Sequence, residues 1–304
     1  MGKEKKLIGL SAGRRHGNSE ILLKEALMAA EELGLKTEII RATDLRVKPC
    51  TGCETCTMLM AKGKISNCII TDDDVEWVLE KTVVEDSALI ISTPIYHLVP
   101  NGLLTLINHR MLPILFRNPR VLKKTRVGGI ICVGGGEPEW TPLGLLNANI
   151  FLQHTRILVD QIQVNYCGRP GQVLAYEHYL RRARKLGENV ARATSMPPEK
   201  VKFKGDDGDT VCPVCHCDVL KVPDKLPQVV CPICQVNGVV TVVNGKMAVV
   251  WDPGDVRTPR FSEQGIGAHA EYIANNMRKF FEEQQVVINK LKQKYANWGN
   301  LVTP

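Results

Sequence analysis

The stretch LIGLSAGRRHGNSEI, residues 7–21, decides the fold of this chain. It begins as a short apolar strand at 7–10, turns through small and basic residues at 11–17, and enters a helix expected to end near residue 33. The backbone N–H groups of such a turn and the N-terminal dipole of the helix both favour an anion, and Arg14 or Arg15 adds positive charge. On these residues alone, the segment is either a phosphate-binding loop or a basic surface turn.

The strand–helix unit repeats along the first two thirds of the chain. Further apolar strands are expected at 37–40, 88–92, 127–133 and 157–164, with helices near 74–84, 101–116, 142–154 and 172–194. Because the strands are continuously apolar rather than alternating, we expect a parallel sheet covered by helices on both faces. The sequence therefore predicts an α/β fold with a doubly wound five-stranded parallel sheet, in which ligands bind at the carboxyl ends of the strands.

The pattern changes after Met196-Pro197-Pro198. We expect a first domain at 1–198, with a cysteine-rich loop at 49–68, and a small β module at 205–252. In that module Asn244-Gly245 separates two β-branched runs, which is typical of a type I′ hairpin turn. Residues 253–304 are expected to form a linker and a long C-terminal helix, whose narrow apolar stripe favours packing against its own domain or a second subunit.

Composition limits the classes of protein to consider. The 304 residues carry a net charge of +7, spread thinly along the chain, so nucleic acid is not expected as a partner. No apolar run approaches the roughly 20 residues that span a bilayer, and no long apolar segment follows the basic N-terminus. We therefore expect a cytoplasmic protein without a membrane partner.

The eleven cysteines are the most informative residues. Nine of them fall into two groups, and in a reducing cytosol such spacing indicates metal or cluster ligation rather than disulfides. The first group contains Cys50, Cys53, Cys56 and, after eleven intervening residues, Cys68. Three thiolates at two-residue gaps suit one face of a [4Fe–4S] cluster, with a fourth ligand from further along. Zinc, or no metal at all, is the alternative for this group.

The second group consists of two Cys-x2-Cys pairs about fifteen residues apart, which is the spacing of a zinc ribbon. The expected zinc ligands are Cys212, Cys215, Cys231 and Cys234. Cys217 competes with Cys215, and the x2 spacing favours Cys215. Iron in a rubredoxin-like site is the minority alternative. The module lacks clustered arginines and interleaved aromatic residues, so a structural or docking role is expected.

Within the opening stretch, Arg14, Gly17, Asn18 and Ser19 match a Gly-Ser-Pro-Arg…Gly-Asn-Thr/Ser pattern. In this the segment resembles the phosphate loop of the iron–sulfur flavoprotein and NADPH-dependent FMN reductase families. Ser11-Ala12-Gly13 departs from the Gly-Ser-Pro part of that pattern. The resemblance implies a flavodoxin-like fold that binds FMN.

Two further loops carry the resemblance. Thr93-Pro94-Ile95-Tyr96 is similar to the families' Ser-Pro-Val-Tyr loop, which lies beside the isoalloxazine ring, and Gly134-Gly135-Gly136 is similar to their glycine-rich turn. His97 is either a proton donor near the flavin, and so a catalytic residue, or a histidine facing solvent. The FMN-binding residues implied are Ser11, Arg14, Gly17, Asn18, Ser19, Thr93, Pro94, Ile95, Tyr96, His97, Gly134, Gly135 and Gly136.

The iron–sulfur flavoproteins also carry a compact cysteine motif in the loop after the second strand. The resemblance therefore implies that Cys50, Cys53, Cys56 and Cys68 ligate a [4Fe–4S] cluster, although the last gap is longer than is usual in that family.

The leading hypothesis is an FMN-dependent oxidoreductase that passes electrons between this cluster and FMN. Its redox partner is a ferredoxin-like protein or NAD(P)H, and a homo-oligomer, a dimer or larger, is expected. One alternative is an NAD(P)H-dependent FMN or quinone reductase with structural cysteines. Another is a regulator that uses the ribbon to bind nucleic acid or protein.

Overall fold

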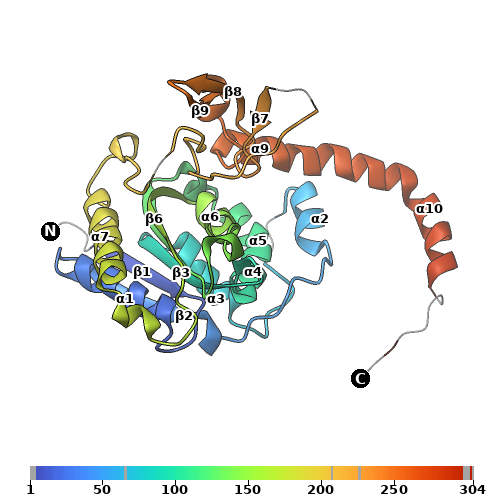
Figure 1. The fold of residues 1–304 in the computed structure, drawn as a ribbon. Coiled ribbons are helices and arrows are strands. Elements are labelled where there is room, and N and C mark those ends of the chain that lie inside the picture. The colour runs from blue at the N-terminus through green and yellow to red at the C-terminus, as the bar shows by residue number, and fades with distance from the viewer. Residues whose placement is uncertain (1–4, 65–66, 207, 225–226, 297–301, 303–304) are drawn as a thin grey trace.

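Five parallel strands form the centre of the computed structural model, which describes residues 5–64, 67–206, 208–224, 227–296 and 302. The sheet order is β2-β1-β3-β5-β6, and the two-residue strand β4 pairs antiparallel with the end of β3. This is the predicted doubly wound, flavodoxin-like arrangement (Figure 1). The strands are β1 (Lys6–Ser11), β2 (Lys36–Arg41), β3 (Ala88–Tyr96), β4 (Val99–Pro100), β5 (Arg126–Val133) and β6 (Arg156–Val164).

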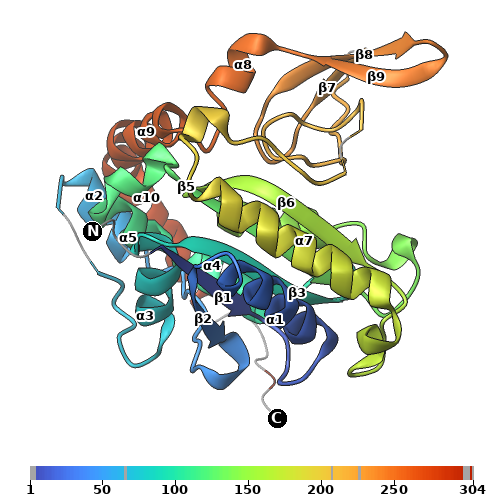
Figure 2. The ribbon, with the colours of Figure 1, turned by 90° about the vertical axis from the view of Figure 1, so that its left-hand side faces the viewer.

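Helices cover both faces of this sheet (Figure 2). One face packs against α1 (Asn18–Glu31) and α7 (Glu177–Ala193). These two helices approach so closely that a Cβ at Gly187 would lie 2.0 Å from the carbonyl oxygen of Ala26, and only glycine fits there. The other face packs against α3 (Val75–Leu79), α4 (Gly102–His109), α5 (Leu112–Arg117) and α6 (Gly144–Gln153).

Several predicted elements have different boundaries in the structure. β3 continues through Tyr96, so the prediction that this strand ends at residue 92 is wrong; pairing with β5 and β4 extends it. The helix predicted at 101–116 is split between α4 and α5, because Pro113 lacks the N–H that would continue the hydrogen-bond ladder. The helix predicted at 74–84 is α3 followed by a π-helical turn, η2 (Glu80–Val84).

A second, antiparallel sheet contains β7 (Gln228–Val230), β8 (Asn237–Val243) and β9 (Lys246–Trp251). Asn244 and Gly245 join β8 to β9 with φ of 51° and 75°, as a type I′ turn requires, so the predicted hairpin is confirmed. We call this sheet, together with the two cysteine pairs that precede and follow its first strand, the ribbon.

The chain ends in α8 (Pro253–Arg257), α9 (Glu263–Tyr272), a π-helical segment η7 (Ile273–Met277) and α10 (Arg278–Tyr295). The segment η7 packs against α2 (Thr55–Ala61), the short helix in the cysteine-rich loop, while α10 extends away from the body (Figure 1).

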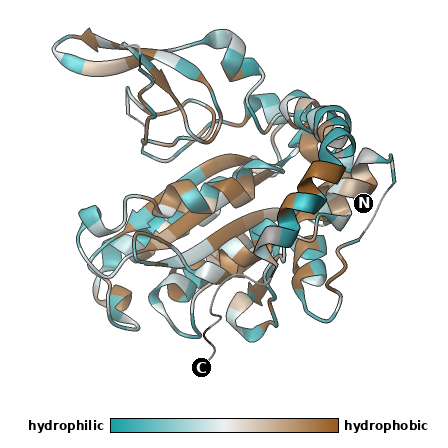
Figure 3. Cartoon of the chain, turned by 90° about the vertical axis from the view of Figure 1, so that its right-hand side faces the viewer, coloured by the Kyte–Doolittle hydropathy of each residue, from teal (hydrophilic) through white to brown (hydrophobic). Residues whose placement is uncertain are grey.

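Apolar residues concentrate in the central strands, whereas the C-terminal helices carry many polar residues (Figure 3). Among the described helices, none combines the length and the apolar character that crossing a bilayer would need.

Candidate functional site

A cavity of about 300 Å³ opens at the carboxyl ends of the parallel strands, where a doubly wound sheet is expected to bind its ligand. Its size is in the usual range for a small-molecule site. The lining comes from the loops that follow β1, β5 and β6 and from the last residues of β3 and β5. The lining residues are Arg14, Gly17, Asn18, Ser19, Pro94, Ile95, Tyr96, Val133, Gly135, Cys167, Gly168 and Pro170.

The first loop builds an anion-binding end. A Cβ at Gly13 would lie 2.2 Å from Ser19 Oγ, so glycine lets the turn fold tightly over the start of α1. The first N–H groups of α1 have no partner within the helix and attract negative charge. Arg15 is paired with Asp44 at 3.3 Å, whereas exposed Arg14 makes no ion pair with any described residue. Arg14 is thus available to a ligand phosphate.

Asn18 lines the cavity, but its side chain is already committed to a neighbouring loop. Its amide donates to the carbonyl oxygens of Cys167 at 2.7 Å and Arg169 at 2.8 Å, and its Oδ1 accepts from the N–H of Val173 at 3.1 Å. These three bonds fasten the loop after β6 onto the start of α1. The side chain therefore positions the wall of the cavity, and only the backbone N–H of Asn18 remains for a ligand.

The rest of the lining consists mainly of apolar residues and glycines. Pro94, Ile95 and Tyr96 form one side, and Tyr96 is 57% exposed at the opening. A Cβ at Gly135 would lie 3.0 Å from Gly168 Cα, so the loops after β5 and β6 touch through glycines. Glycine backbone at this point leaves room for a planar ring.

Some predicted flavin contacts lie outside the lining. Ser11 is fully buried at the end of β1, and the hydroxyl of buried Thr93 donates to the carbonyl of Pro94 at 3.0 Å and accepts from Asn101 N–H at 3.2 Å. His97 is exposed beyond the end of β3, with φ of 47°. Gly134 and Gly136 flank Gly135 without lining the cavity.

Sequence reasoning missed Val133 and the loop after β6, which supplies Cys167, Gly168 and Pro170. The signal was present, because a glycine and a proline directly follow an apolar strand there. The residues present fit FMN: a glycine-lined turn with an unpaired arginine suits a phosphate, and the part of the lining made of glycine, proline and apolar residues suits a ring system.

The first cysteine group lies in the loop after β2 and at the start of α2. Cys50 and Cys53 are exposed, and Cys56 occupies the first turn of α2. Left-handed backbone at Gly52 and Glu54 winds the loop around Cys53. Burial raises the pKa of the Cys56 thiol, and the nearby thiols of Cys53 and Cys50 raise it further. The thiols of Cys50, Cys53 and Cys56 therefore lie close enough for a charge on one to affect the others.

The four sulfurs of this group are less closely gathered than those of the ribbon. Zinc holds its sulfur ligands at about 2.3 Å, which places the sulfurs roughly 4 Å apart. Among the described residues, the ribbon cysteines are the sole set of three or more metal-ligating side chains gathered within 4.8 Å.

Buried Arg110 closes the base of the cysteine-rich loop. Its guanidinium donates to the carboxylate of buried Asp73, to the carbonyl of Ile70 at 2.7 Å and to the carbonyl of Lys48 at 3.4 Å. Cys50 follows Lys48 by two residues, and Cys68 precedes Ile70 by two. One arginine thus holds together the two ends of the segment that carries the first cysteine group.

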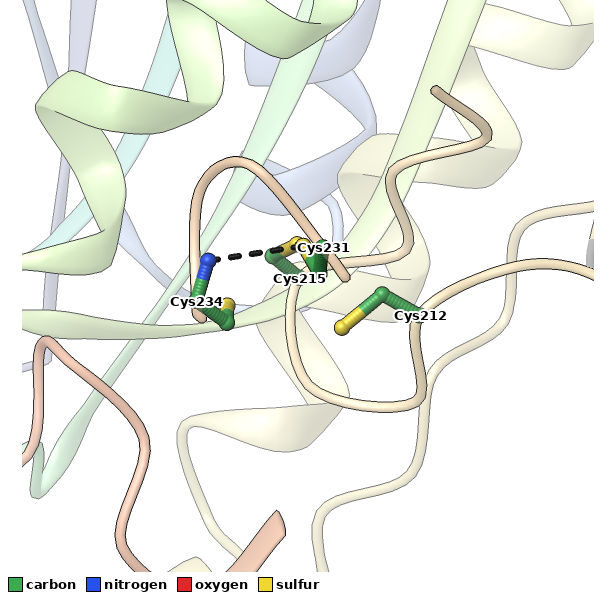
Figure 4. Close-up of side chains that lie close together, drawn as sticks. All are labelled: Cys212, Cys215, Cys231 and Cys234. Carbon is green, nitrogen blue, oxygen red and sulfur yellow. Dashed lines mark hydrogen bonds between the residues drawn. The ribbon is translucent and has the colours of Figure 1, made fainter. Parts of the chain in front are cut away.

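The ribbon brings Cys212, Cys215, Cys231 and Cys234 together as buried side chains (Figure 4). The sulfurs of Cys215 and Cys231 are 3.5 Å apart, close to the separation in a tetrahedral zinc site. Cys217 stands outside this set, and its sulfur accepts from the N–H of Val219 at 3.4 Å.

The two cysteine pairs form equivalent turns. His216 N–H donates to Cys212 O and Gln235 N–H donates to Cys231 O, each at 2.9 Å. The residue after each second cysteine, His216 or Gln235, has left-handed backbone. The repeated geometry aims both pairs at one point, as a metal with four thiolate ligands requires.

The ribbon is fastened to the flavodoxin-like domain. Asn149 of α6 donates to Cys215 O at 2.5 Å, and Gln161 of β6 donates to His216 O at 3.1 Å. Phe203 stacks on His216 with ring centroids 3.6 Å apart. None of the described ribbon residues lines the cavity.

Comparison with known proteins agrees with this geometry. Residues 6–141 match the family of NADPH-dependent FMN reductases. An iron–sulfur flavoprotein of Methanocaldococcus jannaschii is 32% identical over 203 residues, which cover 63% of this chain and 98% of the relative. A flavone synthase of Aspergillus candidus is 26% identical over 266 residues, 77% of each chain. A solved flavone reductase matches with a TM-score of 0.76 and 24% identity over 98% of this chain and 99% of its own.

Proposed function

The chain belongs to the iron–sulfur flavoprotein family and is a flavin-dependent oxidoreductase, and from this premise we propose that its first cysteine group holds a [4Fe–4S] cluster that exchanges electrons with FMN. The observation that carries the proposal is that one domain holds two separate sites: a cavity whose lining fits FMN and a loop that contains four cysteines. The phosphate-binding turn and the cysteine-rich loop begin at the carboxyl ends of neighbouring strands, β1 and β2. The loop then leads back along the sheet, so that α2 packs against α5 and η7 on the side where β5 begins (Figure 2).

In this proposal Arg14 and the N–H groups that open α1 hold the phosphate of FMN, and Pro94, Ile95 and Gly135 lie along the ring system. Bound FMN supplies exchange of either one or two electrons, which suits an enzyme between one-electron and two-electron partners. Asn18 keeps the loop after β6 in place against the ligand.

Cys50, Cys53, Cys56 and Cys68 are the proposed cluster ligands. The open spacing of this group and the closure of its base by Arg110 support the assignment. The electron donor is proposed to be a ferredoxin-like protein or NAD(P)H. The ribbon cysteines are proposed to hold one structural zinc ion, because their four sulfurs are buried and close enough for a single tetrahedral ion.

A second candidate activity is the oxidation or reduction of a planar conjugated compound. Three exposed aromatic residues lie on or next to the segments that line the cavity: Tyr96 at 57%, Trp140 at 65% and Tyr166 at 53%. Trp140 lies against Gly136, and Tyr166 N–H donates to the carbonyl of Gly136 at 2.9 Å, so both flank the glycine-rich turn. Aromatic faces exposed beside a flavin suit stacking of a flat substrate. The relative named as a flavone synthase supports this candidate, since its match extends past the flavodoxin-like domain.

Anaerobic purification with flavin, iron, sulfide and zinc analysis tests the proposal. We expect FMN, four irons and one zinc per chain. Stopped-flow reduction of wild type by a reduced ferredoxin is then compared with Cys53→Ala, with Cys217→Ala as the control because Cys217 belongs to neither ligand set. Cys53→Ala should lose fast reduction while FMN stays bound. Equal rates in wild type and Cys53→Ala, or wild-type protein without iron, would favour the second candidate activity with structural cysteines.

A further inference from the structure

A second hollow, of about 510 Å³, lies between the C-terminal half of α7 and the segment that leads to the ribbon. We call it the basic groove. It shares no lining residue with the cavity at the carboxyl ends of the strands. Its lining residues are Val159, Arg182, Lys185, Asn189, Arg192, Ala193, Met196, Lys200, Lys202, Lys204 and Asp206, so six cationic side chains face one carboxylate.

The segment at 200–204 presents its lysines on one side because its apolar residues are anchored on the other. Val201 packs against the core beneath α1 and α7, and Phe203 stacks on His216 of the ribbon. In extended backbone successive side chains point in opposite directions, so Lys202 and Lys204 must point outward together. The N–H of Lys204 donates to Val159 O at 2.7 Å, which fixes the segment along the edge of β6.

The opposite wall of the basic groove comes from α7. Arg182, Lys185, Asn189 and Arg192 recur at gaps of three and four, which places them on one helix face. Buried Asp160 accepts from Arg182 at 3.0 Å and from Asn189 at 2.8 Å, so it neutralises one of the cations. Lys185 pairs with Glu188 at 3.3 Å at the surface.

The remaining cations, Arg192, Lys200, Lys202 and Lys204, make no ion pair with any described residue. Placing like charges on facing walls costs free energy, and an apolar floor strengthens the repulsion because it lowers the local dielectric. Buried Val159 and Ala193 supply such a floor. The helix dipole favours Arg192 near the C-terminus of α7, but it does not account for three lysines on the facing segment.

We propose that the basic groove binds a small ligand carrying two or more linked phosphates, such as the tail of a nucleoside di- or triphosphate. Because the cations lie on two walls, they match a ligand with several linked anionic groups better than a ligand with a single anionic group. The guanidinium fork of Arg192 suits phosphate oxygens, and the lysines add point charges. No aromatic side chain is among the described lining residues, so the groove lacks the stacking platform typical of single-stranded nucleic-acid sites.

The test measures binding of inorganic triphosphate to the FMN-loaded, metal-loaded protein by isothermal titration calorimetry at low and physiological salt. We expect one site per chain, weakened by salt because the attraction is screened. Lys202→Gln/Lys204→Gln should lower the affinity at least tenfold. The matched control, Lys246→Gln/Lys290→Gln, removes the same charge from exposed positions on the β8–β9 turn and on α10, and should leave the affinity unchanged. FMN content should be the same in all proteins.

Three outcomes would overturn the proposal. The first is no binding of triphosphate by wild type, and the second is an equal loss of affinity in both double variants, which would show a general effect of net charge. The third is tighter binding of a single-stranded oligonucleotide that triphosphate cannot displace. Because none of these outcomes depends on electron transfer, the result is independent of the proposed redox function.

Discussion

The side-chain amide of Asn18, at the start of α1, donates a 2.7 Å hydrogen bond to the carbonyl oxygen of Cys167, which lies 149 residues further along the chain. This bond joins the first loop of the cavity to the last one. The anion-binding end and the wall contributed by the loop after β6 are therefore coupled through one side chain.

Asn18→Asp should weaken FMN and riboflavin alike. The carboxylate cannot donate to the carbonyls of Cys167 and Arg169, and it would face their oxygens instead. Leaving such groups unpaired costs about 1–3 kcal/mol, so we expect at least a tenfold loss of affinity for both flavins, measured by fluorescence quenching. Asn147→Asp, which removes a donor to Leu143 O within α6, is the matched control. A loss confined to FMN would instead place the Asn18 side chain on the phosphate.

Arg14→Ala should lower the affinity for FMN but not the affinity for riboflavin. Arg14 is exposed and has no ion pair with the described residues, so its removal disturbs little besides a bound phosphate. A hydrogen bond to a charged group contributes about 1.5–3 kcal/mol, which predicts a loss of roughly 10- to 100-fold for FMN and none for riboflavin. Arg15→Ala serves as the control, since Arg15 pairs with Asp44. Unchanged FMN affinity in Arg14→Ala would contradict the assigned phosphate end.

Arg110→Met should open the cysteine-rich loop. It leaves the carboxylate of Asp73 buried without its partner, which typically costs about 3–5 kcal/mol of unfolding free energy. We expect a lower urea midpoint, faster alkylation of Cys50 and Cys68, and less bound iron. Arg117→Met removes an arginine paired with Glu76 near the surface and should have a smaller effect on all three readouts. Slow alkylation and full iron content in Arg110→Met would show that the loop holds its shape without this arginine.

Cys231→Ser should remove the ribbon metal while FMN remains bound. The ribbon lacks an extensive apolar core, and its buried cysteines occupy the centre. We expect loss of one zinc per chain and rapid proteolysis within 208–251, with flavin absorbance nearly unchanged. Cys217→Ser should retain the metal, because Cys217 lies outside the four-cysteine set. Loss of flavin together with zinc would mean that the two sites depend on each other.

The apolar stripe of α10 should mediate self-association. Phe280, Val287 and Leu291 are all more than half exposed on a helix that extends away from the body. We expect wild type to be a dimer or larger by light scattering, and Val287→Glu/Leu291→Glu to be a monomer. Val286→Glu places a charge on another face of the same helix and should leave the assembly intact. A monomeric wild type would show that the stripe has a different role.

The sequence predicted those features that depend on neighbours in the chain. The strand–turn–helix at 7–21, the Asn244-Gly245 hairpin turn and the two Cys-x2-Cys turns each follow from local backbone preferences, and all are present in the structure. The break between α4 and α5 near Pro113 is also a local feature. The apolar residues keep a helical spacing across it, so the pattern predicted one continuous helix.

Features that depend on distant partners were not predictable in this way. The side chain of Asn18 matches a phosphate-loop motif, yet it is used by a loop that follows a different strand. Arg110 has no sequence signature that links it to Asp73 or to the cysteine-rich loop. The basic groove was hidden because its cations come from two segments, and net charge carries no information on their arrangement.

The contact between the outer face of α6 and the ribbon limits where a protein of this architecture can be truncated. Leu146 and Ile150 pack against the ribbon's buried cysteines, while other residues of the helix pack on the sheet. A chain cut before the ribbon would present both apolar side chains to water and should lose solubility. A natural protein of this fold that lacks a ribbon must therefore have polar residues at these two positions, or conceal them against another subunit. Polar residues at positions 146 and 150 would therefore mark a chain of this fold that leaves this face of α6 open to water.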